Sequence, residues 1–173
     1  KTVTFASNSK LTTINRYAFN NCSTLSKITL PASLKTLGKS SFEYCSQLTS
    51  IVIPTNVTYI QDNTFRFCYS LKTVTLKGTV ERIGKSAFMS CGKLKGIHLR
   101  EGLKYIESNA FRYNSSLANV PIPASVEFIG NEAFAYCKKI KSINIPANLT
   151  YISKGAFRNC SSVTTVTIPS SVT

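Results

Sequence analysis

The sequence predicts a repeat solenoid, mainly β, in which about seven coils of 23 residues stack on one another. A phenylalanine recurs every 23 residues without insertion or deletion, and five further apolar columns keep the same step. The phenylalanine column comprises Phe19, Phe42, Phe65, Phe88, Phe111, Phe134 and Phe157. A unit of this length is too short for the four strands of a propeller blade. Each unit is therefore one coil, whose apolar side chains are buried only when neighbouring coils cover them.

Residues 48–70 show the order of elements expected within one coil. Residues 51–53 alternate inward and outward positions before Pro54, which predicts a short strand that ends because proline has no amide donor. Val57 and Ile60, three apart, predict a second short extended or 3₁₀ piece after a turn. A cysteine then follows the phenylalanine by three residues, a spacing that predicts a helical or 3₁₀ turn on the convex side. We therefore expect one parallel sheet with short helical or 3₁₀ turns.

The whole chain, 1–173, is predicted to be a single repeat domain and a fragment of a longer protein. We expect an irregular first coil at 1–24, regular 23-residue coils from 25, and a truncated last coil at 163–173. In the first coil, Val3 and Phe5 should take the strand positions of the next coil. The chain opens and stops part-way through a coil without polar caps, which favours a fragment. No apolar run is long enough to predict a transmembrane segment.

The consensus LxxIxIPxxVxxIGxxAFxxC summarises the repeat, and two coils match it closely. The matching residues are Leu25, Ile28, Leu30, Pro31, Leu37, Gly38, Phe42 and Cys45 in one coil, and Val126, Ile129, Gly130, Ala133, Phe134 and Cys137 in another. This pattern resembles the BspA-like leucine-rich repeat family of bacterial and protozoan surface proteins. Departures are local: Lys77 and Arg100 replace the proline, Pro121 sits inside a strand, and Asn114 replaces a cysteine.

The resemblance implies a right-handed leucine-rich repeat solenoid with one parallel sheet. It also implies an extracellular or cell-surface location, and adhesion to host proteins or other cells.

Six cysteines occupy one column: Cys22, Cys45, Cys68, Cys91, Cys137 and Cys160. Equivalent residues in adjacent coils lie about 4.7–4.9 Å apart, whereas a disulfide prefers about 3.8 Å between Cβ atoms. The close cysteine pairs typical of metal sites are absent. We therefore predict buried thiols that pack in the coil interior, with no metal and no cofactor. Asn114 fits the same column because its amide can satisfy backbone groups.

Catalytic groups are scarce, so the sequence predicts that the chain is not an enzyme. It holds one histidine, one aspartate and six glutamates, and no spacing that would assemble a nucleophile with a base. His98 lies between Ile97 and Leu99 and should point outward from a strand.

The candidate binding surface combines two groups of residues that the repeat does not dictate. The first precedes the inward isoleucine of the second extended piece and comprises Tyr59, Arg82, Tyr105, Phe128 and Tyr151. The second lies around the first strand and comprises Lys72, Lys95, His98 and Lys141. Rows of Tyr and Arg are frequent in binding surfaces, although aromatic ladders also shield turns.

Three functions remain open at this point. The chain could be a surface-exposed adhesion module that contacts extracellular or host proteins, or a stalk that spaces another domain from a surface. Its net charge of +14 also allows a polyanion partner, either a glycosaminoglycan or nucleic acid. Nucleic acid is less favoured, because its recognition usually interleaves aromatic and basic residues along one groove.

Overall fold

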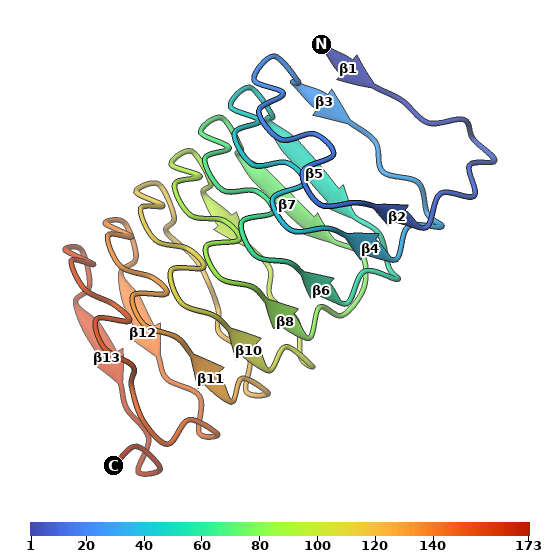
Figure 1. Ribbon diagram of the computed structural model, residues 1–173. Coiled ribbons are helices and arrows are strands. Elements are labelled where there is room, and N and C mark those ends of the chain that lie inside the picture. Colours follow the sequence, from blue (N-terminus) through green and yellow to red (C-terminus); the bar gives the residue numbers. More distant parts are fainter.

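In the computed structural model, which describes residues 1–173, the chain winds into a parallel β-solenoid of about seven coils (Figure 1). The coils follow one another along a single axis from the N-terminus to the C-terminus. Each coil hydrogen-bonds to equivalent positions about 23 residues away, so the repeat period sets the stacking directly. The predicted solenoid is confirmed.

One side of six successive coils contributes to a six-stranded parallel sheet, which we call the second strand row. Its strands are β2 (Thr13–Ile14), β4 (Thr36–Leu37), β6 (Tyr59–Ile60), β8 (Arg82–Ile83), β10 (Tyr105–Ile106) and β11 (Phe128–Ile129). Each strand has two residues, the first directed outward and the second buried. The pairing is in register, with Ile83 opposite both Ile60 and Ile106. Very short strands thus form a continuous sheet because six successive coils each supply an equivalent pair.

A separate side of the coils carries the strands that precede the proline column, which we call the first strand row. It comprises β1 (Thr2–Val3), β3 (Lys27–Ile28), β5 (Ser50–Ile53), β7 (Thr73–Leu76), β9 (Gly96–Ile97), β12 (Ser142–Asn144) and β13 (Thr165–Thr167). The expectation of one parallel sheet is therefore incomplete, because two strand rows occupy two sides of the coil (Figure 1). The three-residue spacing of Val57 and Ile60 marks the additional row.

The first strand row is broken into sheets of two, three and two strands. Between β9 and β12, a single bridge from Gly96 to Asn119 replaces a strand pair. Pro121 lies in this coil and has no amide hydrogen to donate to a neighbouring strand. In the sequence, Pro121 departs from the repeat pattern, and the structure places a break of the first strand row in the same coil. In the first coil, Val3 pairs with Ile28 and so takes the strand position expected for it.

The segment around each phenylalanine contains no helix, which corrects the expected helical or 3₁₀ turn. In residues 61–68, Thr64, Arg66 and Cys68 donate their amides to carbonyls three residues earlier, whereas Asn63, Phe65 and Phe67 donate to the next coil. Asn63 and Phe67 have φ of 55° and 61°, a conformation that interrupts a right-handed helix. The segment is thus a series of turns that serves both its own coil and the next.

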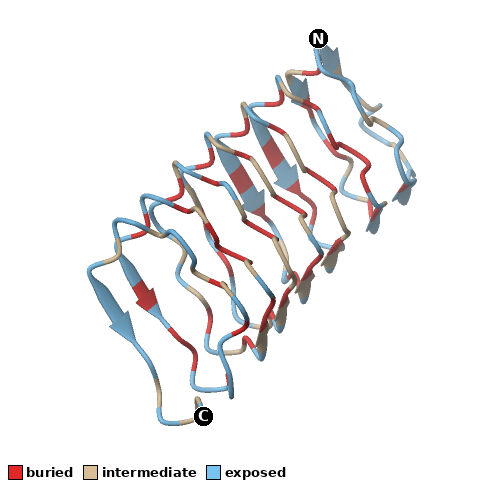
Figure 2. Cartoon of the chain, turned by 60° about the vertical axis from the view of Figure 1, so that its left-hand side comes forward, coloured by how far each residue is buried: buried red, intermediate tan, exposed pale blue.

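The interior is one hydrophobic cluster of 41 buried residues that runs the length of the solenoid. Figure 2 shows buried residues alternating with exposed ones along the middle coils, whereas the coils at the two ends are largely exposed. All seven rings of the phenylalanine column stack on their neighbours, with centroids 5.2–5.5 Å apart and planes within 11°. Successive coils are therefore joined by the same contact throughout.

The cysteine column does more than fill space, which corrects the prediction that its thiols merely pack. The thiol of Cys68 donates to the carbonyl of Phe42 at 3.2 Å, and Cys91 makes the same bond to Phe65. Asn114 replaces the thiol with an amide whose nitrogen donates to the carbonyls of Phe88 and Phe111, both at 2.8 Å. The column thus satisfies carbonyls that the turns leave buried. No cysteine forms a disulfide, and Cys22, which no earlier coil covers, is exposed rather than buried.

Candidate binding surfaces

The structure divides the nine candidate residues between the two strand rows. Four lie on the second strand row, and the fifth, Tyr151, lies beyond its last strand but contacts Phe128. The five are called here the aromatic row: Tyr59, Arg82, Tyr105, Phe128 and Tyr151. The other four lie on or beside the first strand row, where all are exposed: Lys72, Lys95, His98 and Lys141. The nine residues therefore form two surfaces rather than one.

The aromatic row is built by strand register. Arg82 pairs with Tyr59 on one side and with Tyr105 on the other, and Tyr105 in turn pairs with Phe128. The guanidinium of Arg82 lies 4.4 Å from the ring centre of Tyr105 and 5.9 Å from that of Tyr59. Such cation–π contacts orient both groups. Tyr151 extends the row, with its ring edge toward Phe128 at 6.4 Å.

Carboxylates balance the positive charge beside the aromatic row. Arg82 donates to Glu107 at 3.0 Å, and Glu127 lies 3.7 Å from the ammonium of Lys104. The hydroxyl of Tyr105 also reaches Glu127 at 3.4 Å. These glutamates were not predicted as part of the surface, because the residue that each glutamate contacts lies 22 to 25 residues away in the sequence, in the adjacent coil. A search for opposite charges offset by about one repeat would have found them.

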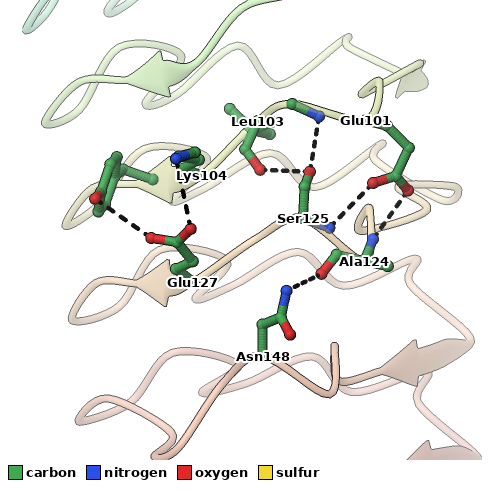
Figure 3. A network of polar contacts seen from close by, with 9 residues as sticks. Glu101, Leu103, Lys104, Ala124, Ser125, Glu127 and Asn148 are labelled. Carbon is green, nitrogen blue, oxygen red and sulfur yellow. Dashed lines mark hydrogen bonds and ion pairs between the residues drawn. The ribbon is translucent and has the colours of Figure 1, made fainter.

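A polar network fixes the turn that precedes the aromatic row (Figure 3). Glu101 accepts the amides of Ala124 and Ser125 in the next coil at 3.0 and 3.1 Å. The hydroxyl of Ser125 then donates to Leu103 and accepts from the amide of Gly102. The carboxylate of Glu101 is therefore bound by backbone donors, and it forms no ion pair with its neighbour Arg100.

A second group of aromatic side chains lies on the edge formed by the phenylalanine turns. Tyr44 and Phe67 have ring centres 4.6 Å apart, and Tyr113 and Tyr136 are 4.7 Å apart. These four residues have φ between 61° and 64°, a region that bulky residues rarely occupy. Arg66 caps the ring of Phe67 at 4.3 Å. The rings thus cover one another, which fits a ladder that shields a turn.

Burial makes the interior thiols unreactive. It raises the pKa of the Cys45 thiol to about 12 and that of Cys68 well above its ordinary value. A thiol that stays protonated is a poor nucleophile. Nowhere in the chain do three His, Cys, Asp or Glu side chains come close enough to hold a metal ion. There is also no helix with the length and apolar character needed to cross a membrane.

Comparison with known structures places this fold among bacterial proteins. A leucine-rich repeat protein from Bacteroides ovatus is 33% identical over 99% of this chain, with a TM-score of 0.91. The T. pallidum leucine-rich repeat protein is 27% identical over 94% of the chain, with a TM-score of 0.84. A leucine-rich repeat protein from Eubacterium ventriosum is 26% identical over 98% of the chain, with a TM-score of 0.76.

The chain spans 46%, 77% and 44% of the lengths of these three proteins, respectively. No curated protein matches the chain significantly. The BspA type leucine rich repeat region, in 6 copies, matches residues 1–118 and 62–173. Repeat modules of this kind are typically non-catalytic and serve protein interaction or repeat architecture. The matched residues and the fold agree, and the chain belongs to the BspA-type leucine-rich repeat family.

Proposed function

We propose that the chain is a non-catalytic adhesion module of an extracellular or cell-surface protein, and that its aromatic row contacts an extracellular or host protein. Proteins of the BspA type are generally surface or secreted bacterial proteins, which supports the location. The observation that carries the proposal is the in-register row of Tyr59, Arg82, Tyr105 and Phe128 on neighbouring coils, which the ring of Tyr151 extends. Tyr and Arg are the residues most enriched among those that dominate protein binding energy.

The aromatic row is also ordered before any partner arrives. Tyr59, Arg82 and Tyr105 belong to strands, and the ion pair of Arg82 with Glu107 holds its guanidinium between the rings. A surface fixed in this way loses little side-chain freedom on binding. Five coils at about 4.8 Å each make the row roughly 20 Å long, a length suited to an extended segment of a partner protein.

The test replaces the three tyrosines of the aromatic row with the residue that earlier coils carry at the same position. Thr13 and Thr36 occupy this column in the first two coils, so Y59T/Y105T/Y151T should preserve the fold. Binding to immobilised fibronectin and fibrinogen is measured at physiological salt for both proteins. We expect the affinity to fall about tenfold or more, as for loss of central interface aromatics.

A matched control removes three exposed tyrosines elsewhere, again using residues from the same columns. Y17N, Y69S and Y113N copy Asn63, Ser46 and Asn21, and their combination should leave binding within about twofold of the parent. An equal loss in both variants, or no binding of the parent to either protein, would contradict the aromatic row as the binding surface.

A second candidate function is a spacer that holds another domain away from a surface. The continuous cluster of 41 residues and the unbroken phenylalanine stack favour a rigid rod. A spacer requires no exposed contact residue. The spacer role therefore predicts unchanged whole-cell adhesion when the full-length protein carries Y59T/Y105T/Y151T, whereas the adhesion module predicts a large loss.

A further inference from the structure

Charge is divided unequally around the coil. Residues 69–77, 92–100 and 138–146, which we call the basic face, run from the end of the phenylalanine turn through the first strand row. They contain eight Lys or Arg and no Asp or Glu, and all eight basic residues are exposed. None of the eight takes part in an ion pair. More than half of the net charge of +14 therefore lies uncompensated on one side.

The acidic residues cannot neutralise the basic face, because most are engaged elsewhere. Five form ion pairs with other basic residues: Glu43, Asp62, Glu107, Glu127 and Glu132. Glu101 adjoins the basic face at Arg100 but accepts the amides of Ala124 and Ser125. The unbalanced charge is thus a property of the folded surface as well as of composition.

Strand register brings like charges together on the basic face. Lys72 and Lys95 are equivalent residues of adjacent coils, and the amide of Lys95 donates to the carbonyl of Lys72 at 3.5 Å. Lys77, which follows β7, and Arg100 in the next coil are likewise equivalent residues. Like charges on adjacent strands repel. A bound polyanion would relieve this repulsion along the solenoid axis.

The break in the first strand row separates two parts of the basic face. Two hollows of about 500 and 250 Å³ flank Pro121; the polar residues that line them are His98, Arg100 and Glu101 in the larger and Asn119, Ser142 and Asn144 in the smaller. The row therefore offers a recessed, polar position between the lysines of residues 92–100 and those of 138–146.

We propose that the basic face binds a linear sulfated polysaccharide along the solenoid axis. Exposed hydroxyl and amide groups of Thr73, Thr75, Ser142 and Asn144 lie among the cations and can hydrogen-bond sugar hydroxyls. The outward strand positions carry no Phe or Tyr, and Tyr69 at one end is the single Phe or Tyr ring of the basic face, so nucleic-acid bases have no row of rings on which to stack. Tyr69 is the single large hydrophobic side chain exposed on the basic face, so the face lacks a cluster of apolar groups for insertion into a lipid surface.

The experiment compares two variants that each lose three positive charges. K72T/K95T/K141T gives the basic face the threonine found at Thr49 and Thr164 in the same column. K35T/K85S/K154N removes unpaired lysines elsewhere and copies Thr58, Ser108 and Asn131 of their columns. Unfolding midpoints confirm that both variants fold. Binding of a fluorescent heparin octasaccharide is then followed by anisotropy at two salt concentrations, with neutral dextran, duplex DNA and anionic lipid vesicles as further probes.

We expect the parent to bind heparin at physiological salt and K72T/K95T/K141T to lose about tenfold or more in affinity, with a shallower salt dependence. The control should lose about twofold or less. Equal losses would show that total charge acts without a site and would overturn the proposal. Binding of DNA or vesicles as tight as that of heparin, or no binding of heparin, would overturn it too. Because the variants leave the aromatic row intact, failure here is distinct from failure of protein adhesion.

Discussion

The two strand rows differ in continuity and in charge although the same repeat builds both. The second strand row pairs without interruption over six strands, whereas the first is divided between β3 and β5 and again near Pro121. Beside the aromatic row, Arg82 and Lys104 have carboxylate partners, whereas the lysines of the basic face have none. The interior columns beneath both rows are nearly invariant in chemistry. Outer positions can therefore diverge because the core carries the stability.

The largest effect is expected from a substitution that creates a cavity in the interior shared by the two strand rows. Phe88 is fully buried and stacks on rings at 5.4 Å on both sides. We expect Phe88→Ala to lower the free energy of unfolding by about 3–5 kcal/mol and to weaken both strand rows. Urea denaturation measures the loss. Phe19→Ala is the control, because Phe19 is half-buried and has one stacked neighbour, so its cost should be clearly smaller. Equal costs would mean that the stack does not couple the coils.

A second test targets Asn114, which lies in the same coil as Pro121. Asn114→Ala removes two buried hydrogen bonds, to Phe88 and Phe111, and should cost about 2–3 kcal/mol in denaturation experiments. Asn114→Cys restores the residue usual in this column and also removes Oδ1, which has no partner. Its cost should therefore be well below that of alanine. A cysteine variant as unstable as the alanine variant would show that this coil differs from the others in more than one residue.

The thiol column predicts a loss of stability in alkaline solution. Burial raises the pKa of Cys45 from 9.0 to about 12, and it also raises the pKa of Cys68 and Cys160. Above pH 9 the unfolded chain releases thiol protons that the folded chain retains, so rising pH favours unfolding. Each buried thiol should cost about 1.4 kcal/mol per pH unit above 9. Stability should be nearly independent of thiol ionisation below pH 8.

Urea denaturation between pH 8 and 10 checks this slope. Cys91→Asn, which copies the arrangement at Asn114, should reduce the slope of unfolding free energy against pH by the contribution of one buried thiol. A slope unaffected by Cys91→Asn would rule out thiol ionisation as its cause.

The smallest effect is expected from repair of the first strand row. Pro121→Thr supplies the missing amide and copies the residue at Thr75 and Thr167. The free energy gained from the added strand pairing is offset by the greater conformational entropy of an unfolded chain without the proline. The free energy of unfolding should therefore change by about 1 kcal/mol or less. Amide exchange of residues 119–122 should nevertheless become slower, which hydrogen exchange can measure. Unchanged exchange would indicate that the break has a cause other than the proline.

Several structural features could be predicted from residues alone, and others could not. The 23-residue step of the phenylalanine column predicts the solenoid, and the pairing of Val3 with Ile28 was anticipated. The helical turn was a wrong prediction, because the spacing of Phe65 and Cys68 suits a helix as well as a series of turns. The amino-acid sequence gives no indication that bulky residues such as Phe67 have a positive φ. It arises because alternate amides are required by the next coil.

The sequence by itself determined the period, the inward columns and the residues that occupy the surface, since a fixed repeat aligns equivalent side chains in every coil. Only the tertiary structure decided which surface residues face the same way. Tyr59, Arg82 and Tyr105 share one strand row, whereas Lys72 and Lys95 lie beside the other. The physical reason is that each coil contains two strand segments, and the path of the chain between them determines which way the outward side chains of each segment point. Partners such as Arg82 and Glu107 likewise meet only when adjacent coils stack.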